Sequence, residues 1–266
     1  MKRVLVTGAA RGLGLSIANR FADKGAELVL TDIQEEALED ARERLAHQGA
    51  RCRAYQVDVT DPAAIAQARE RLHGEMGSVD ILVNNAGVVF GGPFLEVPLE
   101  QHRLTYRINV EGVVNMTHAF LPDLIASPRG HLVNIASASG FVGLPNGTTY
   151  ASSKWAAIGF SESIRAELKH QGHKNVSVTT VCPTFINTGM FEGAEPPKTT
   201  QMLNASDIAD KVIEAVEKEQ IWVLEPWIVK ITPFLKHCLP TPISDFIADA
   251  FGASKSMDRW SGHGTH

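Results

Sequence analysis

Short apolar segments alternate with amphipathic helical patterns along most of the chain, and this alternation restricts the fold more than any other feature. We expect strands at residues 2–7, 27–31, 51–58, 79–84, 130–136, 175–182 and 220–224. The helical patterns between them fall at residues 12–24, 34–48, 61–76, 98–126, 149–170 and 206–219. Apolar strands that alternate with helices are typical of a parallel sheet covered on both faces. With right-handed crossovers, the sequence predicts an α/β fold built on a doubly wound, seven-stranded parallel sheet.

The length of 266 residues fits one large α/β domain over residues 1–266. Two regions depart from the alternation. Residues 184–205 are rich in Pro, Gly and Thr, and we interpret them as a substrate-loop insertion; residues 225–266 form a C-terminal extension that we expect to be helical. The extension mixes lysines with apolar residues, a pattern that fits packing on the domain or a partner subunit, which we favour, or contact with a membrane surface. Its apolar residues are Trp227, Ile228, Ile231, Phe234, Leu235, Leu239, Phe246, Ile247 and Phe251.

Composition excludes several classes of protein. The net charge is −5 and no basic stripe occurs, so we expect no nucleic-acid partner. The three cysteines and ten histidines are scattered without ligand spacing, which predicts reduced thiols, a cytoplasmic location and no metal. No segment reaches the roughly 18 apolar residues of a membrane span. A strand pattern follows the first three residues directly, so we expect no signal peptide.

A glycine-rich turn, TGAARGLG at residues 7–14, joins the first expected strand to the first expected helix. Gly8, Gly12 and Gly14 let the backbone turn tightly and approach a pyrophosphate at the helix N-terminus, where free N–H groups and the helix dipole receive it. Three glycines alone are a weak signal, because a bare tight turn also needs them. Their place between strand and helix favours dinucleotide binding on a Rossmann-type sheet.

Asp32 ends the second expected strand and predicts a preference for NAD over NADP. An acid about 20 residues after the glycine motif can accept hydrogen bonds from the adenosine ribose hydroxyls. It would also repel the extra phosphate of NADP, by roughly 4 kcal/mol for two charges about 4 Å apart at an effective dielectric of about 20. Arg11, in the glycine turn, is a cation that partly offsets this repulsion.

Two further strand ends carry candidate cofactor contacts. Asp58, at the end of the third strand, is placed to accept a hydrogen bond from the adenine amino group. The segment NNAG follows the fourth strand, and its small residues Ala86 and Gly87 allow the chain to pass close under a cofactor. A cofactor contact at Asn84 and a structural role for Asn85 fit equally well, since buried asparagines often tie strands together.

Tyr150 and Lys154 open the long helical pattern at residues 149–170 and share one helix face. A tyrosine has a pKa of roughly 10, and a nearby cation lowers it. Tyr150 is therefore a candidate to exchange a proton with an alcohol while hydride leaves the same carbon. Ser137, at the end of the fifth strand, can polarise the substrate oxygen, and the amide of Asn109 can hold a water that relays protons to Lys154.

Taken together, these motifs resemble those of the short-chain dehydrogenase/reductase family over roughly residues 2–190. The resemblance implies a catalytic tetrad of Asn109, Ser137, Tyr150 and Lys154, with the last two also contacting the cofactor. It implies that Ile186 contacts the nicotinamide carboxamide and Thr188 a phosphate or amide of the cofactor. Further cofactor contacts that it implies are Leu13, Val59 and Pro183. Thr184 departs from the family pattern, which usually has glycine there, so the loop is stiffer and the mouth of the site narrower.

Segments 181–193, 221–227 and 234–260 resemble the branch of that family that contains retinol dehydrogenases and lipid-droplet hydroxysteroid dehydrogenases. Members of this branch usually carry an N-terminal membrane anchor, and this chain resembles a soluble version. The resemblance implies a retinoid, steroid or long-chain alcohol as substrate, and a homodimer or homotetramer.

We expect a mobile apolar lid from residues 189–205 and the tail, with Met202 and Leu203 among its members. The expected substrate walls are Phe90, Val142, Leu144, Met190 and Phe191, beside Ser137. Three other functions stay open: a dehydrogenase of small polar alcohols, a dinucleotide sensor without catalysis, and a lipid-binding protein at a membrane surface.

Overall fold

The seven strands form one parallel sheet in the order β3-β2-β1-β4-β5-β6-β7, which confirms the predicted fold. The computed structural model describes residues 2–197, 200–250, 252 and 255–262, so Phe251 of the apolar tail lies outside it, as do the side chains of Leu235 and Ile247. The strands are β1 (Arg3–Thr7), β2 (Glu27–Asp32), β3 (Arg51–Gln56), β4 (Ile81–Asn84), β5 (Gly130–Ile135), β6 (Val176–Pro183) and β7 (Trp222–Glu225).

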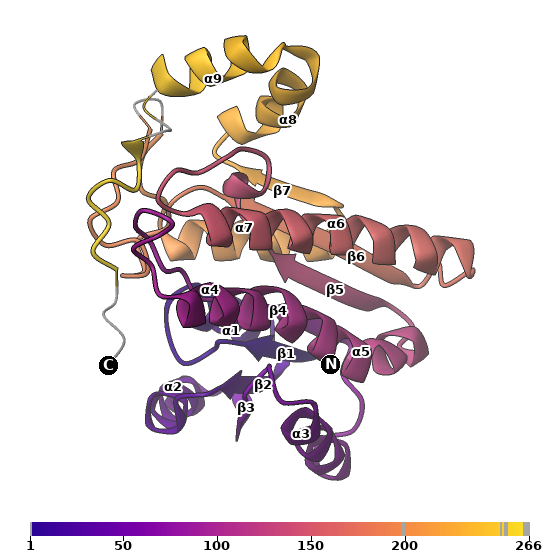
Figure 1. The fold of residues 1–266 in the computed structure, drawn as a ribbon. Helices are drawn as coiled ribbons and strands as arrows, with labels where there is room; N and C mark the ends of the chain where they lie inside the picture. The colour runs from indigo at the N-terminus through magenta and orange to yellow at the C-terminus, as the bar shows by residue number, and fades with distance from the viewer. Residues whose placement is uncertain (1, 198–199, 251, 253–254, 263–266) are drawn as a thin grey trace.

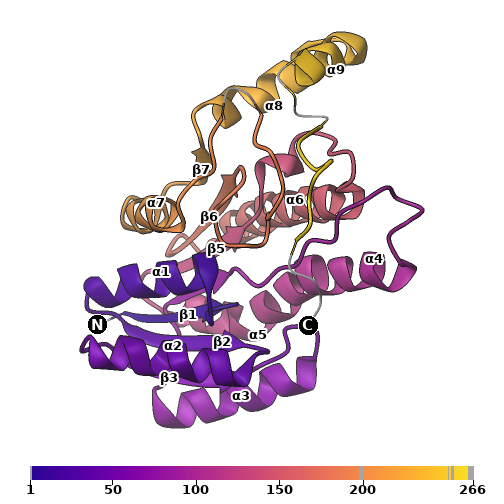
Figure 2. The same cartoon turned by 90° about the vertical axis from the view of Figure 1, so that its left-hand side faces the viewer.

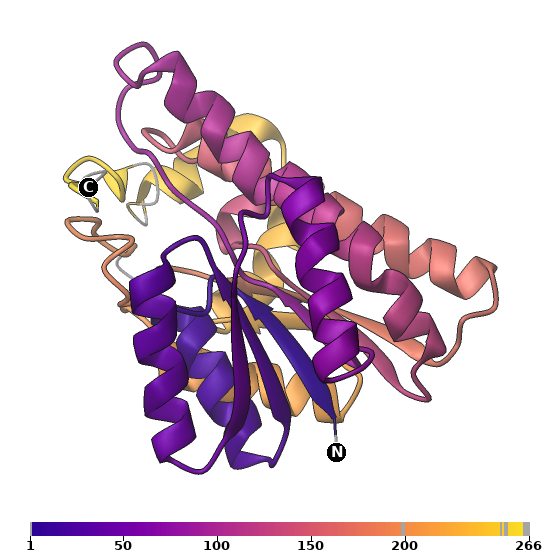
Figure 3. The same ribbon diagram turned by 90° about the horizontal axis from the view of Figure 1, so that it is seen from below.

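Helices cover both faces of the sheet (Figures 1 and 3). The helices up to the sixth strand are α1 (Gly12–Asp23), α2 (Glu35–His47), α3 (Pro62–Glu75), α4 (Leu99–Tyr106), α5 (Gly112–Ala126) and α6 (Thr148–His170). The later helices are α7 (Ala205–Glu217), α8 (Ile228–Cys238) and α9 (Thr241–Ala250). Two short helical turns, η1 (Arg107–Glu111) and η2 (Ala138–Gly140), complete the described elements.

Two apolar clusters, one on each face of the sheet, explain why the central strands carry apolar residues on both faces, unlike the edge strand β3. Val4 and Val6 of β1 pack with α1, α2 and α7, whereas Leu5 between them packs with α3, α5 and α6. This alternation is the period of two that a strand imposes on its side chains. Strand order reverses direction between β1 and β4, and in open α/β sheets ligands bind at the carboxyl ends of the strands beside such a point.

The helix expected over residues 98–126 is interrupted, which corrects the sequence-based expectation. The π-helical turn η1 separates α4 from α5, and Asn109 in this turn is buried. Its side chain bonds to the backbone of Val88 in the chain after β4 rather than facing solvent. Helical periodicity could not reveal this, because an extra residue in one turn is fixed by contacts with distant backbone; such π-bulges are frequent at functional sites.

The C-terminal extension is helical, as expected, but only part of it packs on the domain. Val229 and Ile228 of α8 pack against β7, whereas Trp227, Phe234 and Phe246 are more than half exposed. After α9 the chain returns to the body of the protein beside the loop that precedes α7 (Figures 1 and 2). Within the residues that the structure describes, no helix is both long and apolar enough to cross a membrane.

A buried carboxylate, Asp123 of α5, ties α3 and the start of β4 to the sheet. It accepts hydrogen bonds from Arg69 at 2.7 Å and from the backbone N–H of Val79 at 3.0 Å, and His73 Nε2 lies 2.6 Å away. Burial alone would raise the pKa of Asp123, but these bonds outweigh it and hold the pKa below its ordinary value. The stability that they give is therefore present above the unfolded-state pKa of about 4 and is lost as pH falls through the folded-state pKa.

We expect Asp123→Asn to lower the free energy of unfolding by about 3 kcal/mol at pH 7, because it removes a buried charge that Arg69 needs. Urea denaturation measures this loss. The control is Asp210→Asn, which breaks an ion pair whose side chains are 37% and 58% exposed, and which should cost less than about 1 kcal/mol. The gap between wild type and Asp123→Asn should shrink below about pH 4. Equal losses in the two variants would contradict this account.

Candidate active site

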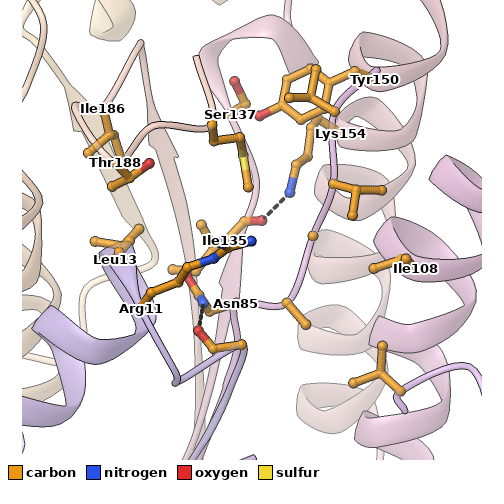
Figure 4. A pocket seen from close by; sticks show the side chains of 18 of the residues that line it. Arg11, Leu13, Asn85, Ile108, Ile135, Ser137, Tyr150, Lys154, Ile186 and Thr188 are labelled. Carbon is orange, nitrogen blue, oxygen red and sulfur yellow. Dashed lines mark hydrogen bonds between the residues drawn. The ribbon is translucent and has the colours of Figure 1, made fainter. Parts of the chain in front are cut away.

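One cavity of about 360 Å³ opens at the carboxyl ends of the central strands and gathers most of the predicted site residues (Figure 4). The predicted cofactor residues that line it are Gly8, Arg11, Gly12, Leu13, Asp32, Asp58, Val59, Ala86, Gly87, Tyr150, Lys154, Pro183, Ile186 and Thr188. The predicted substrate residues that line it are Phe90, Ser137, Met190 and Phe191. Gly14, Asn84, Asn109, Val142 and Leu144 do not line it.

The glycine turn has the backbone geometry that dinucleotide binding requires. Gly8 and Gly12 have φ of 63° and 61°, values that favour glycine. No side chain caps the first turn of α1, so its N–H groups remain available for a pyrophosphate. A Cβ on Gly14 would collide with the carbonyl oxygen of Gly8. Gly14 thus acts by letting helix and turn pack closely rather than by facing the cavity, and the turn fits the proposed cofactor.

Two carboxylates at strand ends are held by backbone N–H groups and keep acceptor capacity for a ligand. Asp32 accepts from the N–H of Ala10 at 3.1 Å and from that of Gln34 at 3.0 Å. Asp58 accepts from the N–H of Thr60 at 2.8 Å. A carboxylate has about four lone-pair sites, so each retains free ones toward the cavity.

At the end of β4 the structure corrects the assignment of Asn84 and agrees with the structural role expected of Asn85. Asn84 is buried beneath the cavity and donates to Thr117 Oγ1 at 3.0 Å and to Asn134 Oδ1 at 2.9 Å, so it ties α5 and β5 to β4. Asn85 lines the cavity and donates to the carbonyl of Thr7 at 2.9 Å, which fixes the glycine turn against β4. Asn84 is the last paired residue of β4, and its partners on α5 and β5 turn its side chain away from the cavity.

Tyr150, Lys154 and Ser137 meet in the cavity from two elements (Figure 4). Tyr150 and Lys154 lie one turn apart on α6, with Lys154 Nζ 5.7 Å from the centroid of the tyrosine ring. Nζ donates to the carbonyl of Ile135 at 2.9 Å, which holds the ammonium under the phenol. Ser137 follows β5, and its hydroxyl accepts hydrogen bonds from Ser139.

Burial has the largest effect on the pKa values of both Tyr150 and Lys154. It raises the pKa of Tyr150 to about 12, and the hydrogen bond with Ser137 opposes it only in part. Burial also lowers the pKa of Lys154 to about 8. The expected lowering of the tyrosine pKa by the lysine is therefore not what the structure gives. At neutral pH the side chain is a phenol, a proton donor suited to a carbonyl oxygen.

Asn109 is bonded to the backbone of Val88 and to Ser153, not directly to Tyr150, Lys154 or Ser137. Its Oδ1 accepts from the N–H of Val88 at 2.9 Å, and its Nδ2 donates to the carbonyl of Val88 at 2.9 Å and to Ser153 Oγ at 3.0 Å. Both N–H groups are thus used, so a relay water held by this amide would have to donate to the second lone pair of Oδ1. A Cβ on Gly87 would lie 3.2 Å from Asn109 Oδ1 and 3.7 Å from Lys154 Nζ. Asn109 therefore lies near Lys154 and fixes the segment at Gly87 and Val88, which follows β4.

The apolar end of the cavity is aromatic. Phe191 meets the ring of Tyr150 edge-on at 5.7 Å between centroids, and the ring of Phe185 at 5.1 Å. Leu144 packs behind this cluster rather than facing the cavity, whereas Thr184 lines the cavity. The cavity residues that the sequence analysis did not identify are Ile33, Gln34, Val57, Asn85, Val88, Val89, Ile108, Ile135 and Ala136. Of the other expected lid residues, Met202 joins the aromatic cluster and Leu203 pairs with Ile186.

Comparison with known proteins defines the class. Residues 2–199 match the family model described as short chain dehydrogenase. Human epidermal retinol dehydrogenase 2 is 38% identical over 258 residues, which cover 96% of this chain and 84% of that protein. Human estradiol 17-beta-dehydrogenase 11 is 33% identical, with coverage of 89% and 79%.

Solved structures agree with this assignment. A short-chain dehydrogenase/reductase from Burkholderia phymatum in complex with NAD has a TM-score of 0.82 and 26% identity, over 95% of this chain and 96% of that one. An alcohol dehydrogenase from Thermococcus sibiricus, complexed with 5-hydroxy-NADP, has a TM-score of 0.74 and 27% identity, over 84% and 94%.

The chain belongs to the short-chain dehydrogenase/reductase family and is an oxidoreductase. Its similarity to the retinol and estradiol dehydrogenases places it near that branch of the family, as the sequence motifs predict.

Proposed function

We propose that the protein interconverts a lipophilic alcohol and its carbonyl compound with NAD, using Tyr150 as general acid and base. One observation carries the proposal: a single cavity has the glycine turn and Asp32 at one end, and Tyr150 with Ser137 beside aromatic walls at the other. When bound, the dinucleotide supplies or accepts the hydride.

The chain's own residues orient the substrate and move the proton. The hydroxyl of Ser137 holds the substrate oxygen, and the phenol of Tyr150 donates its proton to a carbonyl oxygen or receives one from an alcohol. Lys154 is fixed by its bond to Ile135. When the lysine is protonated, its positive charge beside the phenol favours the phenolate form of Tyr150. Phe90, together with the aromatic cluster, excludes water from the reacting carbon.

The walls of the cavity support a lipophilic substrate. Phe90, Met190 and Phe191 are apolar, and methionine and phenylalanine adapt to rings and alkyl chains. The two human relatives named above are a retinol dehydrogenase and an estradiol dehydrogenase by name. We therefore place a retinoid, a steroid or a long-chain alcohol ahead of small polar alcohols.

The surroundings of Asp32 support NAD. The carboxylate is fixed at the cavity and is followed by the uncharged residues Ile33 and Gln34. A ribose phosphate beside this carboxylate would be repelled by roughly 4 kcal/mol. Arg11 lines the same cavity and opposes part of that repulsion.

The test is NADH formation at 340 nm by the purified protein, with NAD or NADP and a panel of retinol, hydroxysteroids, long-chain secondary alcohols and short polar alcohols. Turnover with NAD and a lipophilic alcohol supports the proposal. Turnover only on short polar alcohols contradicts the lipophilic substrate, and tight NAD binding without any turnover favours a sensor.

The rate of alcohol oxidation should rise with pH between about pH 6 and pH 8. Well below its pKa of about 12, the phenolate fraction of Tyr150 grows about tenfold for each pH unit. Above about pH 8 the rise should flatten, because Lys154, with a pKa of about 8, loses its charge. Steady-state rates in both directions measure this dependence, and carbonyl reduction should stay nearly constant, because Tyr150 is almost fully protonated over this range. An oxidation rate that falls over this range would contradict the role of Tyr150 as base.

A further inference from the structure

The C-terminal segment, residues 255–262, returns from α9 to the loops that form the apolar end of the cavity (Figures 1 and 2). Met257 in this segment is 2% exposed and belongs to the same apolar cluster as Tyr150 and Phe191. The segment does not line the cavity itself. It lies directly behind the residues that do.

Trp260 contacts both walls of the cavity at once. Its Nε1 donates to the backbone carbonyl of Met190 at 3.1 Å, in the substrate loop. Its ring lies against Gly91, where an added Cβ would be 2.6 Å from Cε3 of the indole. Gly91 follows Phe90 on the opposite wall, so one rigid ring joins the segment that carries Phe90 to the segment that carries Met190 and Phe191.

Further bonds align the C-terminal segment with the substrate loop. Ser261 N–H donates to the carbonyl of Glu192 at 2.9 Å, and Glu195 N–H donates to the carbonyl of Ser256 at 2.9 Å. Arg259 pairs with Glu195 at 2.7 Å. The loop is thus bonded to the segment on both sides of Gly193, a residue with φ of 77° at which a Cβ would collide with the segment's backbone.

A third loop is joined to the same segment. Asn146, in the turn before α6, donates to Asp258 at 3.0 Å, and the N–H of Gly92 donates to the carbonyl of Asn146 at 2.8 Å. The loops after β4, before α6 and after β6 therefore meet at the C-terminal segment. The polar contacts fix the orientation of the segment, whereas the half-buried indole of Trp260 and the buried Met257 supply the apolar contact area.

We propose that Trp260 is a positioning residue that sets the separation of the two cavity walls and thereby selects the lipophilic substrate. This inference rests on the proposed function. The physical reason is that Met190 and Phe191 belong to a loop that bonds to β7 at its base, at Thr184, and to the C-terminal segment beyond it. Without the indole, the loop loses its link to Gly91, and only its bonds to Ser256, Arg259 and Ser261 still hold the wall that the substrate contacts. The cofactor end of the cavity, at Asp32, has no contact with Trp260, so its affinity should not change.

The experiment compares Trp260→Ala, Trp260→Phe and the control Trp227→Ala, which removes a tryptophan that is 63% exposed. For the lipophilic alcohol that the panel identifies, Trp260→Ala should raise KM at least tenfold and change kcat much less. The dissociation constant for NADH should stay within twofold of wild type. Trp260→Phe keeps a ring on Gly91 but loses the bond to the carbonyl of Met190, so its KM should lie between those of Trp260→Ala and wild type. Trp227→Ala should match wild type.

Hydrogen exchange of residues 186–195 gives a readout that does not depend on turnover. It should accelerate in Trp260→Ala and remain unchanged in α1. If the alanine variant does not fold, Gly91→Ala replaces it, because the added Cβ displaces the indole while the tryptophan stays in the chain. Wild-type KM and wild-type exchange in a folded variant would overturn the inference. Absence of turnover by the wild-type protein on the whole panel would reject the proposed function instead, and faster exchange would still establish the contact.

Discussion

Replacing Tyr150 by phenylalanine is expected to reduce kcat for the alcohol about a thousandfold and to leave the affinity for NADH within a few fold of wild type. General acid and base catalysis contributes roughly a hundredfold to ten-thousandfold, and the phenol oxygen is the proton-exchanging atom that the apolar end of the cavity offers beside Ser137. The ring itself remains, so its edge-on contact with Phe191 persists and the fold should hold. Stopped assays at 340 nm measure kcat, and fluorescence titration measures NADH binding.

The matched control is Tyr106→Phe. Tyr106 lies on α4, is 43% exposed, and its hydroxyl contacts Ser152 at 2.7 Å. The control removes the same atom from a tyrosine outside the cavity and should leave kcat unchanged. If Tyr150→Phe keeps more than a tenth of wild-type kcat, the proton must travel by another group and the proposed role of Tyr150 is wrong.

Replacing Asp32 by asparagine should shift the ratio of catalytic efficiencies with NADP and NAD toward NADP by about a hundredfold or more. The removed repulsion is roughly 4 kcal/mol, close to a thousandfold, and asparagine also loses an acceptor toward the ribose. The backbone bonds from Ala10 and Gln34 limit the local disturbance, because an amide oxygen can keep one of them. The measurement is kcat/KM for each cofactor with the same alcohol.

Asp40→Asn is the control for this change, since it removes an exposed carboxylate on the neighbouring helix α2. It should leave the cofactor ratio within twofold of wild type. A ratio that stays unchanged in Asp32→Asn, or a wild-type protein that already prefers NADP, would show that Arg11 or another group decides the choice of cofactor.

The site residues that the sequence identified without the family resemblance are specified mainly by their immediate neighbours in the chain. Gly8 and Gly12 are required by a turn with positive φ, and the one-turn spacing of Tyr150 and Lys154 places both on one helix face. Such local features do not depend on which other segments pack around them. The cavity accordingly holds most of the predicted cofactor residues.

The errors occurred where the outcome depends on distant segments. Asn84 and Asn85 are chemically identical, and only the partners of β4 in α5 and β5 turn the first away from the cavity. Leu144 is apolar and near the site, yet it packs behind the wall that Phe191 forms. Periodicity contains no information about which of several apolar neighbours reaches a cavity.

The sequence by itself determined the sheet, the glycine turn and the pairing of Tyr150 with Lys154, because the periods of strand and helix and the φ demanded of glycine are local properties. Only the tertiary structure decided that Asn109 lies in a π-helical turn bonded to Val88, and that burial raises the pKa of Tyr150 although a lysine lies beside it. It also brought Trp260 between the two walls of the cavity. Burial and contacts between distant segments depend on all the elements that surround a residue, and no single segment of the sequence specifies them.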